Sequence, residues 1–185
     1  METLEKVYQF ALQKNREGII LDTVVLLLFL IGKYSIDSIK SFEPTHNYSK
    51  DDYDLLCKII RPFKKIVVTP QVIAEISNIS RQSLSGAKLQ QYLCAVIDFF
   101  KDRERMEEHH VFFENWNDKS VGRLCSFGFV DMGMFEIAEQ RGVPILTDEE
   151  DLYNFSKKKI PIIKLSVIKY SNLKKFNLPS QIIAR

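Results

Sequence analysis

The chain has 185 residues, of which 45% are hydrophobic and 27% are charged, with only 7 Gly and 6 Pro. This composition is typical of one globular domain and excludes the disordered, collagen-like and disulfide-scaffold classes. The formal net charge of +2 is too small to indicate a nucleic-acid-binding protein through its overall field. The charges are unevenly distributed, however, because every acidic residue lies at or before Asp151 and the basic residues that follow it are unopposed.

The N-terminal residues do not form a secretion signal, because Met1–Lys6 lacks both a basic start and a long apolar stretch. The most apolar run, Ile19–Gly32, is interrupted by Asp22 and is shorter than the ~18–20 apolar residues that span a bilayer. We therefore expect a cytoplasmic protein without a membrane partner.

Helical and strand patterns alternate along the chain. Leu4, Val7 and Ala11 recur at helical spacing, which predicts an N-terminal helical appendage over residues 1–17. A core over 18–165 and a basic C-terminal segment over 166–185 complete a single domain. Short apolar strands separated by helices predict an α/β fold with a parallel sheet. We expect strands at 18–22, 66–69, 144–147 and 161–165, and helices at about 24–33, 51–60, 70–80, 86–108, 119–127, 131–140 and 149–158; residues 34–49 are expected to form a loop, and 104–117 show no clear pattern.

Acidic residues follow two of the expected strands. Asp22 closes the first strand, and residues 148–151 follow the strand at 144–147. Ligands of open parallel sheets bind at these carboxyl ends. Asp22 stands between apolar neighbours, where a buried carboxylate costs several kcal/mol unless a cation or hydrogen-bond donors compensate it. The later cluster has an alternative interpretation, since acidic residues in the first turn of a helix are favoured by the helix dipole.

Two further carboxylates are expected on helices. Glu75 lies about 40° outside the apolar arc of its helix at 100° per residue, so it borders the core or forms a solvated edge. Asp131 shares a helical face with Phe135 and Ala138, although it is also a good N-cap residue.

Carboxylates that converge on one crevice repel one another, so they need a counter-cation at neutral pH. Oxygen ligands select hard cations, and Mg²⁺ is commonly held by a few carboxylates and water. The chain contains no Cys-x-x-Cys pair and its only adjacent histidines are His109 and His110, so a zinc site is not expected. It also contains no glycine-rich phosphate loop.

These motifs, taken in order, resemble the PIN domain family, and the similarity spans Gly18 to Leu165. The family consists of Rossmann-like, three-layer α/β/α domains of metal-dependent ribonucleases with a central, mostly parallel sheet, and it includes VapC-type toxins and stand-alone bacterial proteins. The resemblance implies hydrolysis of RNA phosphodiester bonds with Mg²⁺ or Mn²⁺, and it makes an antitoxin protein and a homodimer candidate partners. The matching segments are Ile20–Thr23, Thr69–Asn78, Phe129–Asp131 and Ile145–Asp148.

The resemblance also implies roles for individual residues. The metal ligands would be Asp22, Asp131 and Asp148, and Glu75 would be the second acidic residue of the site. Glu149 is the next candidate for the fourth acidic position after Asp148. Thr23, Thr147 and Asp151 would support the site, and RNA-backbone contacts are expected from Arg61, Lys64, Lys65, Lys157, Lys158 and Lys159.

One residue departs from the family pattern. Val24 stands where the family usually has Asn after Asp-Thr, which removes an amide from the neighbourhood of the metal. The alternative function is therefore a catalytically impaired PIN-like module that binds RNA or docks a protein. A receiver-like signalling domain is disfavoured, because Leu21-Asp22-Thr23 offers only one acid after the first strand.

Overall fold

A five-stranded, all-parallel sheet forms the centre of the computed structural model, which describes residues 1–13, 17–111, 114, 116, 118–156 and 160–176. The strand order is β3-β2-β1-β4-β5. The bounds are β1 (Gly18–Leu21), β2 (Lys65–Val68), β3 (Met106–Glu108), β4 (Ile145–Thr147) and β5 (Ile162–Lys164). The chain therefore extends the sheet outward in one direction from β1 and then returns to extend it on the other side, so the direction of winding changes between β1 and β4.

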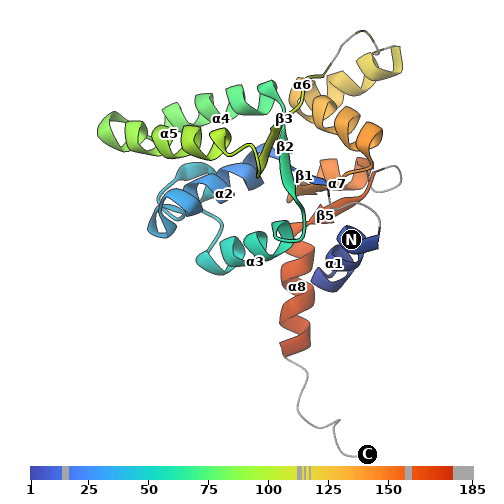
Figure 1. Cartoon of the computed structure of the whole chain (residues 1–185), viewed down its shortest axis with the longest axis horizontal. Helices are drawn as coiled ribbons and strands as arrows, with labels where there is room; N and C mark the ends of the chain where they lie inside the picture. Colours follow the sequence, from blue (N-terminus) through green and yellow to red (C-terminus); the bar gives the residue numbers. More distant parts are fainter. Residues whose placement is uncertain (14–16, 112–113, 115, 117, 157–159, 177–185) are drawn as a thin grey trace, which may run out of the picture.

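Helices cover both faces of the sheet, which confirms the expected three-layer, Rossmann-like α/β/α architecture. In Figure 1, α2, α3 and α5 lie on one side of the sheet, and α6 and α7 lie on the other. The helices are α1 (Leu4–Gln13), α2 (Thr23–Tyr34), α3 (Lys50–Ile60), α4 (Pro70–Ser83), α5 (Gly86–Lys101), α6 (Asp118–Arg141), α7 (Glu150–Ser156) and α8 (Leu165–Phe176). Two short 3₁₀ helices, Ile36–Ser38 and Glu43–Thr45, lie between α2 and α3, where a loop was expected.

Local sequence signals account for where the helices begin. The side chain of Asp22 accepts a hydrogen bond from the backbone N–H of Val25 and starts α2 directly after β1. Thr69 caps α4 in the same way, with Pro70 in the first turn, which confirms the predicted start. Both caps stand at the carboxyl end of a strand, so they fix where two helices leave that edge of the sheet.

The core is continuous across the sheet and reaches the N-terminal helix. Val7 and Ala11 of α1 are fully buried and belong to the same hydrophobic cluster as the strands. The N-terminal ammonium donates to the carbonyl oxygen of Ile162 on β5. The expected appendage is therefore packed as part of the core.

Three elements differ from the expectations. The strand β3 was missed and α5 ends at Lys101 rather than near 108, because the short strand Met-Glu-Glu carries no apolar alternation. The two helices expected at 119–127 and 131–140 are continuous as α6 except for a break at Gly128, which has φ 74°. The segment after β5, expected only as a basic tail, forms α8 as far as Phe176.

No helix within the described ranges is both long and apolar enough to cross a membrane.

The packing of α2 against α3 gives a stability prediction. A Cβ at Gly32 would lie 2.3 Å from Cδ2 and 2.9 Å from Cγ of the Tyr53 ring. We expect Gly32→Ala to lower the free energy of unfolding by about 1–3 kcal/mol, as overpacking does. Gly122→Ala in α6 is the control, because its Cβ would meet nothing within 4 Å and should be neutral or stabilising by up to about 1 kcal/mol. Urea unfolding measures both; equal effects would contradict the proposed close contact.

Candidate active site

Asp22 is the most buried carboxylate at the carboxyl edge of the sheet, with 2% of its surface exposed. Its oxygens accept hydrogen bonds from the N–H of Val25 at 2.7 Å and the N–H of Asp148 at 3.2 Å, and also from the Thr147 hydroxyl. Burial nevertheless raises the pKa of Asp22 to about 7, because the lost hydration outweighs these donors. Asp22 thus joins β1 to the loop after β4 and lacks a full counter-charge.

Glu75 approaches Asp22 from α4. Its Oε2 accepts a hydrogen bond of 2.5 Å from the hydroxyl of Thr23, the residue directly after Asp22. Glu75 is half-buried, so its position on the border of the apolar arc turns it toward the sheet edge rather than into solvent. The Thr23 hydroxyl therefore links α2 to α4 across the site.

Asp131 reaches the same edge from α6. The break at Gly128 lies three residues before it, so Asp131 lies in the first turn of the following helical part and not at its cap. Burial raises the pKa of Asp131 to about 7, and the charges of Glu149 and Glu75 add to the shift. Asp131, Glu75 and Glu149 line one cavity, so Asp131 shares their site.

Glu149 follows β4 and completes a group of four carboxylates. Burial raises its pKa, and the charges of Glu75 and Asp151 raise it further. One cavity of about 270 Å³ is lined by all four carboxylates, from Asp22, Glu75, Asp131 and Glu149. Its other walls are mainly apolar and come from Val24, Ile79, Phe127, Phe129 and Val130.

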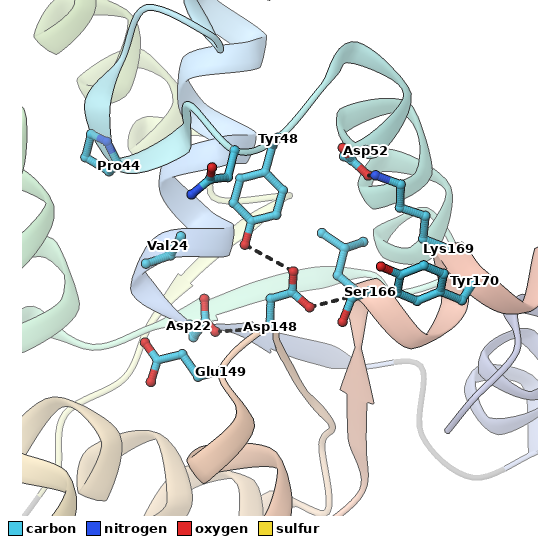
Figure 2. Close-up of a pocket in the computed structure, with 12 residues that line it drawn as sticks. Asp22, Val24, Pro44, Tyr48, Asp52, Asp148, Glu149, Ser166, Lys169 and Tyr170 are labelled. Carbon is cyan, nitrogen blue, oxygen red and sulfur yellow. Dashed lines mark hydrogen bonds and ion pairs between the residues drawn. The ribbon is translucent and has the colours of Figure 1, made fainter.

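Asp148 points into a second cavity, of about 390 Å³, that lies on the side of α8. Figure 2 shows its carboxylate between Tyr48 and Ser166, while the carboxylate of Glu149 points the other way. The Tyr48 hydroxyl donates to Oδ2 of Asp148 at 3.3 Å, and the backbone N–H of Ser166 donates to Oδ1 at 2.9 Å. Asp148 therefore connects the loop before α3 to the first turn of α8.

A salt bridge closes the far side of this second cavity. Lys169 of α8 lies 2.7 Å from Oδ1 of Asp52, whose side chain is only 4% exposed. Burial by itself would raise the pKa of Asp52, but the hydrogen bonds from Lys169 and Ser49 outweigh it and lower the pKa. Asp52 is thus a compensated structural carboxylate, unlike Asp22 and Asp131.

The oxygen atoms around the cavity of about 270 Å³, called the first cavity below, are suitable ligands for a hard divalent cation. This cavity offers only carboxylate and hydroxyl oxygens, and burial and mutual repulsion destabilise three of the four carboxylates in their ionised form. A cation would remove both costs. Within the described part of the chain, no three acidic, His or Cys side chains lie close enough to form a ready-made metal cage. Mg²⁺ ordinarily needs only one or two carboxylates together with water, so the arrangement accommodates it.

The structure groups the predicted acidic residues unequally. Asp22, Glu75, Asp131 and Glu149 line one cavity, and Asp22 and Glu149 also line the second. Asp148 supports the first cavity through its backbone N–H and turns its carboxylate toward the second. Asp151 is exposed in the first turn of α7 and lines neither cavity. Thr147 is fully buried, and its hydroxyl oxygen also accepts the N–H of Glu149 at 2.9 Å.

The basic candidates do not flank this site. Lys65 begins β2 and pairs in register with Gly18, at the opposite edge of the sheet, where it donates to the carbonyl oxygen of Arg103. Lys64 pairs with Glu17, and Arg61 is the C-cap of α3 before the same strand. These three residues therefore do not lie at the rim of the acidic crevice, where they were expected, and their contact with RNA stays a prediction. Lys157, Lys158 and Lys159 lie outside the described residues.

Several residues of the second cavity were not predicted from the sequence, among them Tyr48, Ser166, Lys169 and Tyr170. Tyr48 stood in a stretch without periodicity, and the others belong to α8, which was read as a basic tail. Only the Lys residues of that tail gave a signal, through their charge. Comparison of the chain with protein-family models, curated proteins and solved structures finds no match.

The raised pKa of Asp131 gives a prediction for stability against pH. Its pKa of about 7 in the folded state exceeds its ordinary value of 3.8, so folding loses stability as pH rises between these values. The loss is complete above about pH 7 and absent below about pH 4. The Asp131→Asn variant does not undergo this loss of stability. In EDTA, the Tm of the variant minus the Tm of the wild type should therefore increase from about pH 4 to about pH 7.

Solvent screening reduces the effect at this half-buried position, so we expect an advantage of ~2–4 °C at pH 8, or ~1 kcal/mol. Glu139→Gln is the control, because Glu139 is an exposed carboxylate on the same helix. A Tm difference that does not vary with pH for Asp131→Asn would contradict the uncompensated burial.

Proposed function

We propose that the protein is a metal-dependent ribonuclease of the PIN type that hydrolyses RNA phosphodiester bonds in the cytoplasm. The observation that carries the proposal is the convergence of Asp22, Glu75, Asp131 and Glu149 on one cavity at the carboxyl edge of the sheet. These carboxylates come from four different elements or their ends, and a scaffold has no physical need to gather them at such a cost.

The free-energy cost of burying these carboxylates close together favours a function that depends on a cation. Asp22 and Asp131 have pKa values near 7, so at neutral pH a neighbouring divalent cation would hold both in the ionised form. When bound, Mg²⁺ or Mn²⁺ supplies polarisation of the phosphate and a nucleophile from water. An acidic cavity that holds such ions attracts the RNA backbone it would otherwise repel.

Each residue then has a defined task. Asp22 and Asp131 would hold the ion from two adjacent layers, since Asp22 follows β1 of the sheet and Asp131 lies on α6. Glu149 and Glu75 complete the acidic set, and the Thr23 hydroxyl orients Glu75. Thr147 orients Asp22 through its hydroxyl, while Asp148 does so through its backbone N–H. We therefore assign the fourth acidic position to Glu149 and a supporting role to the Asp148 carboxylate.

The second candidate function is an RNA-binding PIN-like module without catalysis. Val24 favours it, because this apolar residue lines both cavities beside Asp22, where an amide would assist a hydrated ion. One outcome distinguishes the two functions. The enzyme cleaves RNA in Mg²⁺ or Mn²⁺, whereas the module binds RNA without cleaving it at any concentration of either ion.

Cleavage of unstructured RNA tests the enzyme directly. We expect Mg²⁺- or Mn²⁺-dependent cleavage that falls at least ~100-fold in Asp22→Asn and in Asp131→Asn, since each removes a charge that acts on the reacting phosphate through the ion. The matched control is Glu139→Gln, which should retain the wild-type rate. Gel analysis of end-labelled RNA measures all four proteins; activity in EDTA, or in both Asn variants, would overturn the proposal.

The division of roles between Asp148 and Glu149 gives a separate prediction. Glu149→Gln should lower the cleavage rate at least ~100-fold and leave Tm unchanged or higher, because it removes a destabilised charge. Asp148→Asn should weaken hydrogen bonds to a charged acceptor, at a cost of ~1–3 kcal/mol, and lower the rate by less than ~10-fold. The reverse pattern in kinetics and thermal unfolding would assign the fourth position to Asp148.

A further inference from the structure

The second cavity, of about 390 Å³, adjoins the first cavity along a shared wall. Asp22, Val24 and Glu149 line both cavities, so a ligand whose phosphate lies beside the four carboxylates can extend into the second cavity. Its volume falls in the range of small-molecule pockets, roughly 300–1,000 Å³. The second cavity is therefore large enough for one nucleobase next to the proposed reaction site.

Asp148 is the carboxylate of the second cavity that is left to meet such a ligand. Four carboxylates line this cavity among the described residues, from Asp22, Asp52, Asp148 and Glu149. Asp52 is paired with Lys169, and Asp22 and Glu149 belong to the group assigned to the ion. A ligand that enters the second cavity thus meets the acceptor atoms of Asp148.

Two hydrogen bonds hold the Asp148 carboxylate in one orientation. The Tyr48 hydroxyl donates to Oδ2 at 3.3 Å and the backbone N–H of Ser166 donates to Oδ1 at 2.9 Å, as Figure 2 shows. An ionised carboxylate can accept about four hydrogen bonds, two on each oxygen. Each oxygen of Asp148 therefore keeps an acceptor position for a ligand, and the carboxylate presents these two positions side by side.

Other residues of the wall supply a hydrogen-bond donor and apolar faces. Asn47 is exposed, and its side-chain amide makes no hydrogen bond within the described part of the chain. Pro44 comes from the segment before α3 and Tyr170 from α8, and Tyr170 is 66% exposed. A flat ring can lie against these apolar faces while its polar edge meets Asp148 and Asn47.

Guanine matches this set of groups better than the other bases of RNA. Its Watson–Crick edge carries two neighbouring donors, N1–H and the 2-amino group, which fit the two oxygens of one carboxylate, and its O6 atom accepts from an amide. Adenine and cytosine place a ring-nitrogen lone pair beside their amino group, and uracil places carbonyl oxygens on both sides of its N–H. Because these lone pairs would face the negative charge of Asp148, the other three bases fit less well.

We propose that the second cavity is a subsite for a guanine base of the RNA, in which Asp148 accepts hydrogen bonds from N1–H and the 2-amino group and Asn47 donates to O6. The inference rests on the proposed ribonuclease function and adds a base preference at the cleavage site. The guanine must be unpaired, because pairing occupies the same edge. The Asp148 carboxylate, which points away from the first cavity, thereby acquires a role toward the substrate.

Binding of guanosine monophosphate and inosine monophosphate tests the subsite without a phosphodiester bond to cleave. Inosine differs from guanosine only in lacking the 2-amino group, so the ratio of the two Kd values isolates one hydrogen bond to Asp148. We expect the wild type to bind guanosine monophosphate about tenfold more tightly in Mg²⁺, with the phosphate on the 3′ or the 5′ oxygen. Isothermal titration calorimetry with all four nucleotides measures this ratio, and it does not depend on the folding of a variant.

Three variants assign the contacts. Asp148→Asn replaces one acceptor by an amino donor, so the preference for guanosine monophosphate should fall below about threefold. Asn47→Leu should weaken both nucleotides equally, by about three- to tenfold, and keep the preference, because both nucleotides carry O6. Asp54→Asn is the matched control, since Asp54 is exposed on α3 and lines neither cavity, and it should leave both Kd values unchanged.

Cleavage of RNA separates the subsite from the proposed function. The substrates are a uridine-rich RNA with a single guanosine and the same RNA with inosine in its place, and the wild type should cleave the bond beside guanosine about tenfold faster. Equal binding of the two nucleotides, or a preference that survives in Asp148→Asn, refutes the subsite, and cleavage of either RNA would still support the ribonuclease. The expected preference in binding without cleavage of any RNA supports the subsite and refutes the catalytic function. The same preference with equal cleavage of both RNAs would assign the cavity to a free guanine nucleotide and overturn the proposal.

Discussion

The site depends on one constraint, the burial of the Asp22 carboxylate at the end of β1. A carboxylate with 2% exposure requires donors, and this chain supplies them from two directions, through the N–H of Val25 at the start of α2 and through the Thr147 hydroxyl and the Asp148 N–H after β4. These donors fix the relative positions of two neighbouring strands and a helix. They do not neutralise the charge, as the pKa of about 7 indicates, and the remaining deficit is what a cation would satisfy.

The loop after β4 divides the surroundings of Asp22 into two parts. Asp148 is used to hold the structure, since its carboxylate connects Tyr48 to the start of α8 (Figure 2), while Glu149 faces the acidic cavity. Asp52 and Lys169 complete the structural side with a salt bridge. The carboxylates of Asp148 and Asp52 thus have their partners on the side of α8, and Asp22 and Glu149 line both cavities. Asp22, Glu75, Asp131 and Glu149 meet only in the cavity toward α6, which is the physical reason for assigning the proposed chemistry to these four.

The parts of this arrangement that local signals control could be predicted from the sequence. The apolar run ending in Asp22 and the Thr69-Pro70 start of α4 gave the correct elements, because strand length and capping are local. β3 and α8 were missed, since the first is three residues with two glutamates and the second presents its charges more clearly than its buried Leu165 and Ile168. The opposite directions of Asp148 and Glu149 could not be predicted, because they depend on partners, Tyr48 and Ser166, that only the tertiary fold brings near.

The positions of the basic residues also depend on the tertiary fold, so the sequence did not show at which edge of the sheet they lie. Arg61, Lys64 and Lys65 were expected at the rim of the acidic crevice, where RNA would need basic groups. They precede or begin β2, and in a parallel sheet the start of a strand lies at the edge opposite to the carboxyl ends. The asymmetry of charge along the chain does have a structural counterpart. Lys164 and Lys169 from its basic part pair with Glu150 and Asp52, so these lysines serve the packing of β5 and α8. Under the proposed function, the attraction of RNA to the cavity would therefore depend on bound cations.

The claim that the carboxylates around Asp22 hold a divalent cation is tested most directly by anomalous diffraction from crystals soaked in Mn²⁺. The account predicts a manganese peak in the cavity lined by Asp22, Glu75, Asp131 and Glu149, and no such peak in crystals of Asp131→Asn soaked identically. A peak beside Asp148 and Tyr48 instead, or no peak in this cavity at saturating Mn²⁺, would contradict it.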